Sequence, residues 1–236
     1  MGKEHPDTAA TYNNIGNVYI DQGKYDEALK YHFKALDIRE KVLGKEHPYT
    51  ATTYNNIGNV YWKQGKYDEA LEYHFKALDI REKVLGKEHP NTAASYNNIG
   101  NVYYNQGKYD EALKYLFKDL DISEKVLGKE HPSTATTYNN IGNVYADQGK
   151  YDEALEYHFK ALDIREKVLG KEHPDTATTY ISIGWVYRAL GDYEKALAYY
   201  EKAYAIFKAK LGAQHPYTQS VKRSIEFVKK ELKKRH

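Results

Sequence analysis

A five-residue motif returns along this chain at a fixed spacing of 42 residues. Gly-Lys-Glu-His-Pro begins at Gly2, Gly44, Gly86, Gly128 and Gly170, and an altered copy begins at Gly212. A constant period of this size is typical of solenoid proteins, in which each repeat buries its apolar face against its neighbours. We therefore expect one array of five repeats and a closing segment. The repeats are 2–43, 44–85, 86–127, 128–169 and 170–211, and the closing segment is 212–236.

Each repeat carries two helical patterns, and no segment has the alternation of a strand. In the first repeat, His5-Pro6 suits a helix start because proline is well tolerated at the first helical position. Gln22-Gly23 interrupts the pattern, a second one begins near Tyr25, and Gly44 provides a C-terminal stop. Aromatic, aliphatic and small residues share one face of the first pattern at i, i+3, i+4 and i+7, namely Tyr12, Ile15, Gly16 and Tyr19. The sequence thus predicts an all-α fold.

The same positions resemble the tetratricopeptide repeat, whose spacing of aromatic, aliphatic, glycine, tyrosine and two small residues is met by Tyr12, Ile15, Gly16, Tyr19, Ala28 and Ala35. That repeat has 34 residues, and here the second helix runs on through 38–43. The blocks YNNIGNVY, QGKYDEAL, ALDIREKVL and GKEHP are similar to the long repeats of kinesin light chains and of related bacterial and fungal signalling arrays. The resemblance implies a right-handed superhelical solenoid of antiparallel helix pairs, with first helices lining a concave groove.

Composition excludes several classes of function. The chain has no cysteine, so disulfides, thiolate metal sites and cysteine nucleophiles are ruled out. A net charge of +2 does not favour a nucleic-acid partner. No apolar run approaches the ~20 residues of a membrane span and no signal-peptide core follows Met1, so we expect no membrane partner and a cytoplasmic location. We find neither a phosphate-binding loop nor a His-Glu-x-x-His motif, and therefore expect no enzyme activity and no cofactor.

Two sets of histidines raise the question of a metal site. One histidine per repeat, beginning with His5, precedes the proline and should help to start the first helix. His32, His74 and His158 lie on the inner stripe of the second helix, where repeat three has Leu116. Replacement by leucine indicates packing, so we expect no metal. Glycine at position 16 and its copies should allow close approach of two helices, and the tyrosines should pack with their hydroxyls bonded to the backbone.

One face of the first helix combines a constant asparagine ladder with variable positions. Asparagine can donate to and accept from a peptide backbone, while the variable positions would contact side chains. The alternative is that the asparagines bond to each other and only keep the repeats in register, which fits Asn14 and its copies better. The predicted peptide-binding residues are Asn13, Asn17, Ile20, Asn55, Asn59, Trp62, Asn97, Asn101, Tyr104, Asn139, Asn143, Ala146 and Arg188.

Repeat three departs from the others along one stripe of its second helix. Leu116, Asp119 and Ser123 stand where the first repeat has a histidine, an alanine and an arginine. A buried Asp119 would need a donor, for which Arg81 and Arg165 are candidates, or it would lower stability. A packing compensation is favoured over a functional pocket.

The two ends of the array differ. Repeat five and the closing segment replace polar residues by apolar ones, and 221–232 carries one apolar stripe on an otherwise basic helix, as expected for a cap. The first repeat has no comparable cap, which suggests a longer parent protein or an N-terminal face that stacks on something.

The function expected from these features is a non-catalytic scaffold that binds proteins or peptides in the groove. The alternative is a structural module that self-associates end to end through its repeat ends. The sequence identifies neither the partner, nor the source, nor the oligomeric state.

Overall fold

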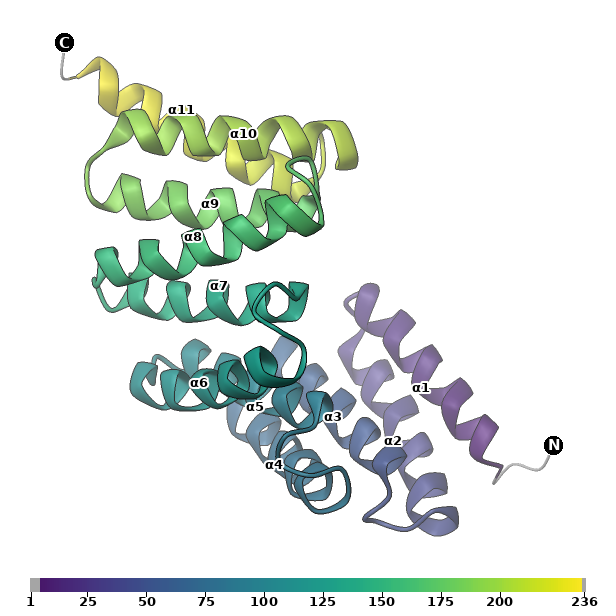
Figure 1. Cartoon of the computed structure of the whole chain (residues 1–236). Coiled ribbons are helices and arrows are strands. Elements are labelled where there is room, and N and C mark those ends of the chain that lie inside the picture. Colours follow the sequence, from purple (N-terminus) through teal and green to yellow (C-terminus); the bar gives the residue numbers. More distant parts are fainter. Residues whose placement is uncertain (1–4, 235–236) are drawn as a thin grey trace. The chain divides into compact units, whose positions relative to one another are not determined.

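The computed structural model describes residues 5–234, which form eleven helices and no strand (Figure 1). The start of the first predicted repeat, at Gly2, and the last residues of the closing segment, Arg235 and His236, lie outside the described residues. In chain order the helices are α1 (Pro6–Asp21), α2 (Tyr25–Val42), α3 (Pro48–Lys63), α4 (Tyr67–Val84), α5 (Pro90–Asn105), α6 (Tyr109–Val126), α7 (Pro132–Asp147), α8 (Tyr151–Val168), α9 (Pro174–Ala189), α10 (Tyr193–Leu211) and α11 (Pro216–Lys233).

Local chemistry sets the helix ends. In every repeat the histidine before the proline is the N-cap, and its Nδ1 accepts from a backbone N–H two residues on, at 3.2 Å from His5 to Asp7 and 3.1 Å from His47 to Tyr49. This confirms that the histidine ladder starts the first helices. Gly44 ends α2 with φ of 93°, which an L side chain rarely adopts, and its N–H donates to the Arg39 carbonyl.

The chain divides into two compact units, Met1–Ile122 and Ser123–His236, with the boundary inside α6. In the first unit α1 pairs with α2 and α3 with α4, while α2 packs on α3 and α4 on α5. The second unit repeats this order from α7 to α11. The connections within a pair span only three residues, so each pair is antiparallel.

First helices also contact first helices, α1 with α3, α3 with α5 and α7 with α9. No comparable contact joins α2 to α4 or α8 to α10, all of which are described helices. The first helices therefore lie closer together than the second helices within each unit. Their exposed faces form the inner side of each unit.

Close approach at the glycines brings the two helices of a repeat together. A Cβ placed on Gly16 would come within 2.7 Å of the His32 ring, and one on Gly58 within 2.9 Å of the His74 ring. Copies of this contact join Gly100 to Leu116, Gly142 to His158 and Gly184 to Tyr200. This confirms the packing interpretation of both the glycines and the inner histidines, and explains why leucine can replace histidine in repeat three.

The closing helix α11 covers the second unit. Val221, Ile225 and Val228 are buried in one cluster with residues of α9 and α10, and Leu232 packs at its edge. Phe207 of α10 lies with its ring centre 5.9 Å from that of Tyr217. The predicted apolar stripe of the cap is thus confirmed.

Candidate functional site

The thirteen predicted groove positions do not share one environment. Asn13, Asn139 and Ala146 are buried, at 5%, 8% and 4% exposure, so the expectation that they face a ligand is wrong for these three. Their side chains point toward the second helix of their own repeat or toward the next repeat rather than outward. The remaining ten positions are half-buried or exposed, namely Asn17, Ile20, Asn55, Asn59, Trp62, Asn97, Asn101, Tyr104, Asn143 and Arg188.

The buried asparagines bind the buried histidines. Asn13 Oδ1 lies 2.9 Å from His32 Nδ1, and Asn13 Nδ2 donates to Thr53 Oγ1 of the next repeat at 3.2 Å. In the fourth repeat Asn139 Oδ1 lies 3.2 Å from His158 Nδ1. Burial, with the charge of a nearby arginine, lowers the pKa of His32 and His158 to about 4. Both rings are therefore neutral at pH 7.

Other asparagines bond between repeats. Asn98 Nδ2 donates to Asn55 Oδ1 at 2.8 Å, and Asn98 is the copy of Asn14 in repeat three. In the second unit Ser182, at the same position of repeat five, donates to Asn143 Oδ1 at 3.2 Å. These contacts are what the register interpretation of the ladder predicts, so these asparagines help to hold the repeats in register.

Asp119 is buried at 3% exposure and accepts a hydrogen bond from Asn97 Nδ2 at 2.7 Å. Asn97 Oδ1 in turn accepts from Asn101 Nδ2 at 2.9 Å. The arginines proposed as donors bind elsewhere: Arg81 donates to the Asn91 carbonyl and to Ser95 Oγ. The donor assigned to Asp119 is thus an asparagine of the groove row, not Arg81 or Arg165.

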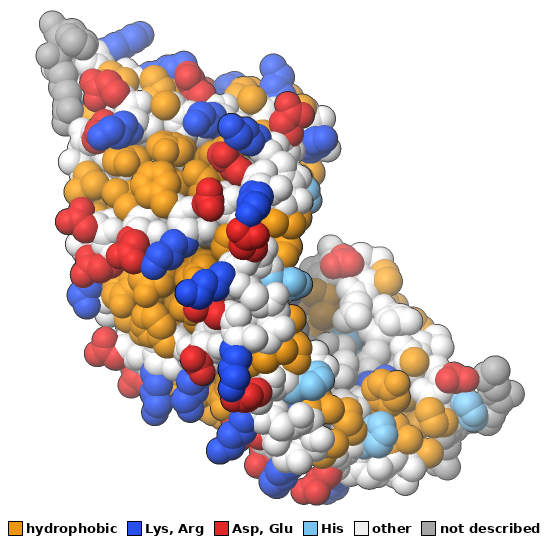
Figure 2. Space-filling model, in the orientation of Figure 1, with side chains coloured by type: hydrophobic (Ala, Val, Ile, Leu, Met, Phe, Trp, Pro, Cys, Tyr) orange, Lys and Arg blue, Asp and Glu red, His pale blue; other side chains and the backbone are white. Residues whose placement is uncertain are grey.

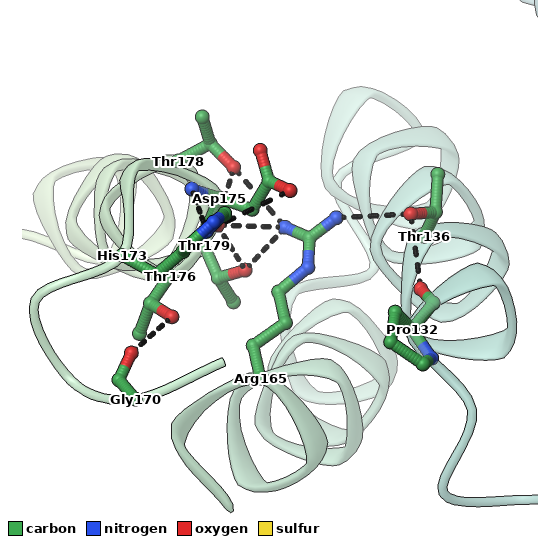
Figure 3. Close-up of polar contacts among 9 residues, drawn as sticks. All are labelled: Pro132, Thr136, Arg165, Gly170, His173, Asp175, Thr176, Thr178 and Thr179. Carbon is green, nitrogen blue, oxygen red and sulfur yellow. Dashed lines mark hydrogen bonds and ion pairs between the residues drawn. The ribbon is translucent and has the colours of Figure 1, made fainter. Parts of the chain in front are cut away.

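A buried arginine fastens the end of a second helix to the next first helix (Figure 3). Arg165 Nη1 donates to the Asp175 carbonyl at 2.9 Å and to Thr179 Oγ1 at 2.7 Å, while Nη2 donates to Thr136 Oγ1 at 3.2 Å. Arg39 in repeat one and Arg81 in repeat two donate equivalent hydrogen bonds to the next first helix. Burial lowers the pKa of Arg165. The recurring arginine was the sequence signal for this contact, which was not among the predictions.

The two aromatic residues of the groove row are partly buried. Trp62 packs against the cluster of buried residues that includes Val102, so part of its ring belongs to the core. The ring centre of Tyr104 lies 6.1 Å from that of Tyr109. A surface depression of about 470 Å³ lies beside Trp62, and Lys63, Gln64, Gly65, Tyr67 and Asn105 complete its lining. In the second unit, Arg188 lies over the Phe227 ring of α11.

Tyrosine hydroxyls bind carboxylates rather than the backbone, which corrects the sequence-based expectation. Tyr180 donates to Glu166 of the preceding repeat at 2.6 Å, and Tyr54 donates in the same way to Glu40. Burial and this hydrogen bond raise the pKa of both tyrosines. Further tyrosines stack on one another, such as Tyr187 on Tyr199. Figure 2 shows hydrophobic side chains gathered between charged ones over the helices of the second unit.

The described residues contain no group of three or more histidine, cysteine, aspartate or glutamate side chains that could hold a metal ion. Among the described helices, none combines the length and the apolar character needed to cross a membrane.

Comparison with known proteins places this geometry in a family. The tetratricopeptide repeat profile matches residues 7–74, 49–118, 94–167 and 133–209. No curated protein matches the chain.

Solved structures with a similar fold include a putative kinesin light chain of Podosopora anserina with nearly identical TPR-like repeats, at 26% identity and a TM-score of 0.72, over 88% of this chain and 98% of that one. BtubC (BKLC) from P. vanneervenii is 27% identical with a TM-score of 0.74, over 89% and 84% of the two chains. Aspartyl phosphate phosphatase F from Bacillus subtilis is 20% identical with a TM-score of 0.75, over 92% and 54%, which shows the fold alone. With its five helix pairs and closing helix, the chain belongs to the tetratricopeptide repeat family.

Proposed function

We propose that this chain is a non-catalytic scaffold that binds extended protein or peptide segments along its first helices. The proposal keeps the predicted repeat boundaries and the cytoplasmic setting expected from the sequence. The observation that carries it is the half-buried row of amide and aromatic side chains on the inner side of the first unit, beside a depression of about 470 Å³.

The chemistry of this row suits a peptide. Asn59 and Asn17 make no side-chain hydrogen bond within the described part of the chain, so their amides are available to a ligand backbone. Trp62 and Tyr104 supply large aromatic surface on adjacent repeats, and such residues dominate binding energy in many interfaces. Asn13, Asn139 and Ala146 are left out of the binding surface because they are buried.

The test uses a display library of random nonapeptides as the probe. We expect the wild-type chain to enrich binders, and Trp62→Ala with Tyr104→Ala to weaken the enriched peptides by at least about tenfold, or about 1.4 kcal/mol. Phe33→Ala with Phe117→Ala is the matched control, because both rings lie on second helices and are 36% exposed. The groove would be rejected as the binding site if both double variants lost the same affinity, or if the wild-type chain enriched no peptides.

Self-association is the second candidate, and one observation favours it. Val18 is 54% exposed, whereas its copies Val60, Val102 and Val144 are at most 1% exposed. The open face of α1 is thus chemically the same as the faces that bury one repeat against another. If light scattering shows a mass that rises with concentration, and Val18→Glu abolishes this rise, the face mediates assembly.

A further inference from the structure

The second repeat contains a polar cavity beside its inner histidine. It measures about 40 Å³ and is lined by Asn59, Trp62, His74, Asn98, Asn101 and Val102. Its lining comes from α3, α4 and α5, so it opens between two first helices at the Trp62 position of the groove row. A site that holds one water needs about 10–15 Å³ by this kind of measure, so the cavity accepts a small polar group.

His74 is the unusual member of this lining. Its side chain is 1% exposed, and its buried Nδ1 has no hydrogen-bond partner within the described residues. At the same position of repeats one and four, His32 and His158 each bind an asparagine through Nδ1 and have their unpartnered ring nitrogen at Nε2 instead. Leaving a ring nitrogen unused in a buried site is costly.

The difference arises from the asparagine opposite the ring. Asn55 occupies the position of Asn13, but its Oδ1 accepts from Asn98 of the next repeat. Repeat two is thus the histidine repeat in which no asparagine closes the site.

From this juxtaposition we propose that the cavity is a specificity pocket for one hydroxyl-bearing side chain, serine or threonine, of a peptide bound along the first helices. A hydroxyl can either donate to the unpartnered His74 Nδ1 or accept from it, according to the tautomer of the ring. The Asn59 amide, which has no side-chain hydrogen bond in the described chain, lies in the same lining.

The charge state of the lining disfavours ionised ligands. A carboxylate or an ammonium group would enter a buried site that contains only neutral donors and acceptors in its lining, which is unfavourable. Trp62 forms one wall, so the pocket lies directly beside the proposed aromatic anchor.

The inference rests on the proposed peptide-binding function, and a double-mutant cycle tests it. Peptides selected from a random nonapeptide library by the wild-type chain are remade with each serine changed to alanine and each threonine to valine. We expect one such change to weaken binding to the wild-type chain about tenfold and to leave binding to His74→Leu unchanged. His158→Leu is the control, since His158 is equally buried but already bonded to Asn139.

Leu116 occupies the same position in repeat three without exposure, so leucine should preserve the fold, and thermal melts verify this. As a second measurement, the ¹⁵N signals of the His74 ring should shift on adding a selected peptide and not on adding its hydroxyl-free version. The pocket would be rejected if removing the hydroxyl left the affinity unchanged, or if it lowered the affinity equally for the wild-type chain and for His74→Leu. Either result would leave the proposed groove intact. If no library peptide binds, both proposals fall.

Discussion

Repeats two and three have the same first-helix motif, YNNIGNVY, but different inner stripes on their second helices. In repeat two the stripe of α4 carries His74, Ala77 and Arg81, all buried. In repeat three the stripe of α6 carries Leu116, Asp119 and Ser123, which are equally buried. The same fold therefore accepts a stripe that has a cation and an imidazole, and one that has a carboxylate and neither of those groups.

The difference shows that neighbouring side chains, not the motif, decide what each asparagine does. Without a histidine beside it, Asn97 donates to Asp119 and accepts from Asn101. In repeat two, Asn55 bonds to the following repeat, and His74 Nδ1 is left without a partner. Four substitutions transfer features between these two repeats or probe their shared packing, and each tests a part of the comparison.

The largest effect is expected from Arg81→Ser, which gives repeat two the residue of repeat three. Arg81 donates to the Asn91 carbonyl at 3.1 Å and to Ser95 Oγ at 2.7 Å. Hydrogen bonds from a charged donor contribute about 1.5–3 kcal/mol each, so after relief of the buried charge we expect a loss of about 3 kcal/mol in the free energy of unfolding. Urea denaturation measures it.

Lys83→Ser serves as the control for Arg81. Lys83 is exposed and pairs with Asp79 and Glu46 at the surface, where ion pairs contribute at most about 1 kcal/mol. Equal stability of the Arg81 and Lys83 variants would show that the buried arginine contributes no more than a surface lysine.

The second-largest effect is expected in the pH dependence of the free energy of unfolding, which should differ between the two stripes. Burial lowers the pKa of His74 from 6.5 to about 4, so the folded chain favours the neutral ring. The associated stability is complete above pH 6.5 and is lost as the pH falls toward 4, because only the unfolded chain takes up the proton in that window. At about pH 5 the loss for this histidine should be about 2 kcal/mol.

His74→Leu, which repeats the residue of repeat three, should remove this part of the acid sensitivity. Urea denaturation at about pH 7.5 and about pH 5 gives the comparison with the wild-type chain. His32 and His158 remain and continue to titrate, so a partial reduction is the expected result. If the free energy of unfolding changed between the two pH values by the same amount in His74→Leu as in the wild-type chain, this would contradict a buried neutral His74 in the folded state.

A smaller effect is expected from Gly58→Ala. The new Cβ would lie 2.9 Å from the His74 ring, and overpacking of this kind costs about 1–3 kcal/mol. The double variant Gly58→Ala with His74→Ala should recover part of that loss, because the ring that blocks the methyl group is gone. Thermal unfolding of both variants tests this, and additive losses would argue against the contact.

The smallest effect is expected from Asp119→Ala, which restores the residue of repeats one, two and four. Removing the carboxylate relieves its desolvation, while the half-buried Asn97 loses one acceptor that water can replace. We expect the free energy of unfolding to change by less than about 1 kcal/mol, or to rise. A loss above about 3 kcal/mol would indicate a buried ion pair instead.

The sequence by itself determined the elements and their order. The histidine–proline starts and the glycine stops predicted the ends of α1 and α2, because capping and turn formation depend on residues within a few positions of each other. The 42-residue period predicted the stacking, and Gly16 with its copies predicted the close approach of two helices. These features follow from local propensity and from a pattern repeated along the chain.

Only the tertiary structure decided which side chains reach the groove. Asn13 and Asn55 stand in the same motif, yet Asn13 is buried on His32 while Asn55 bonds to Asn98, 43 residues further along. No pattern within one repeat could separate them, because each amide also meets a side chain of the next repeat, Thr53 for Asn13 and Asn98 for Asn55. The open His74 site and the asparagine bond of Asp119 exist for the same reason: a buried polar group takes whichever partner the neighbouring repeat leaves available.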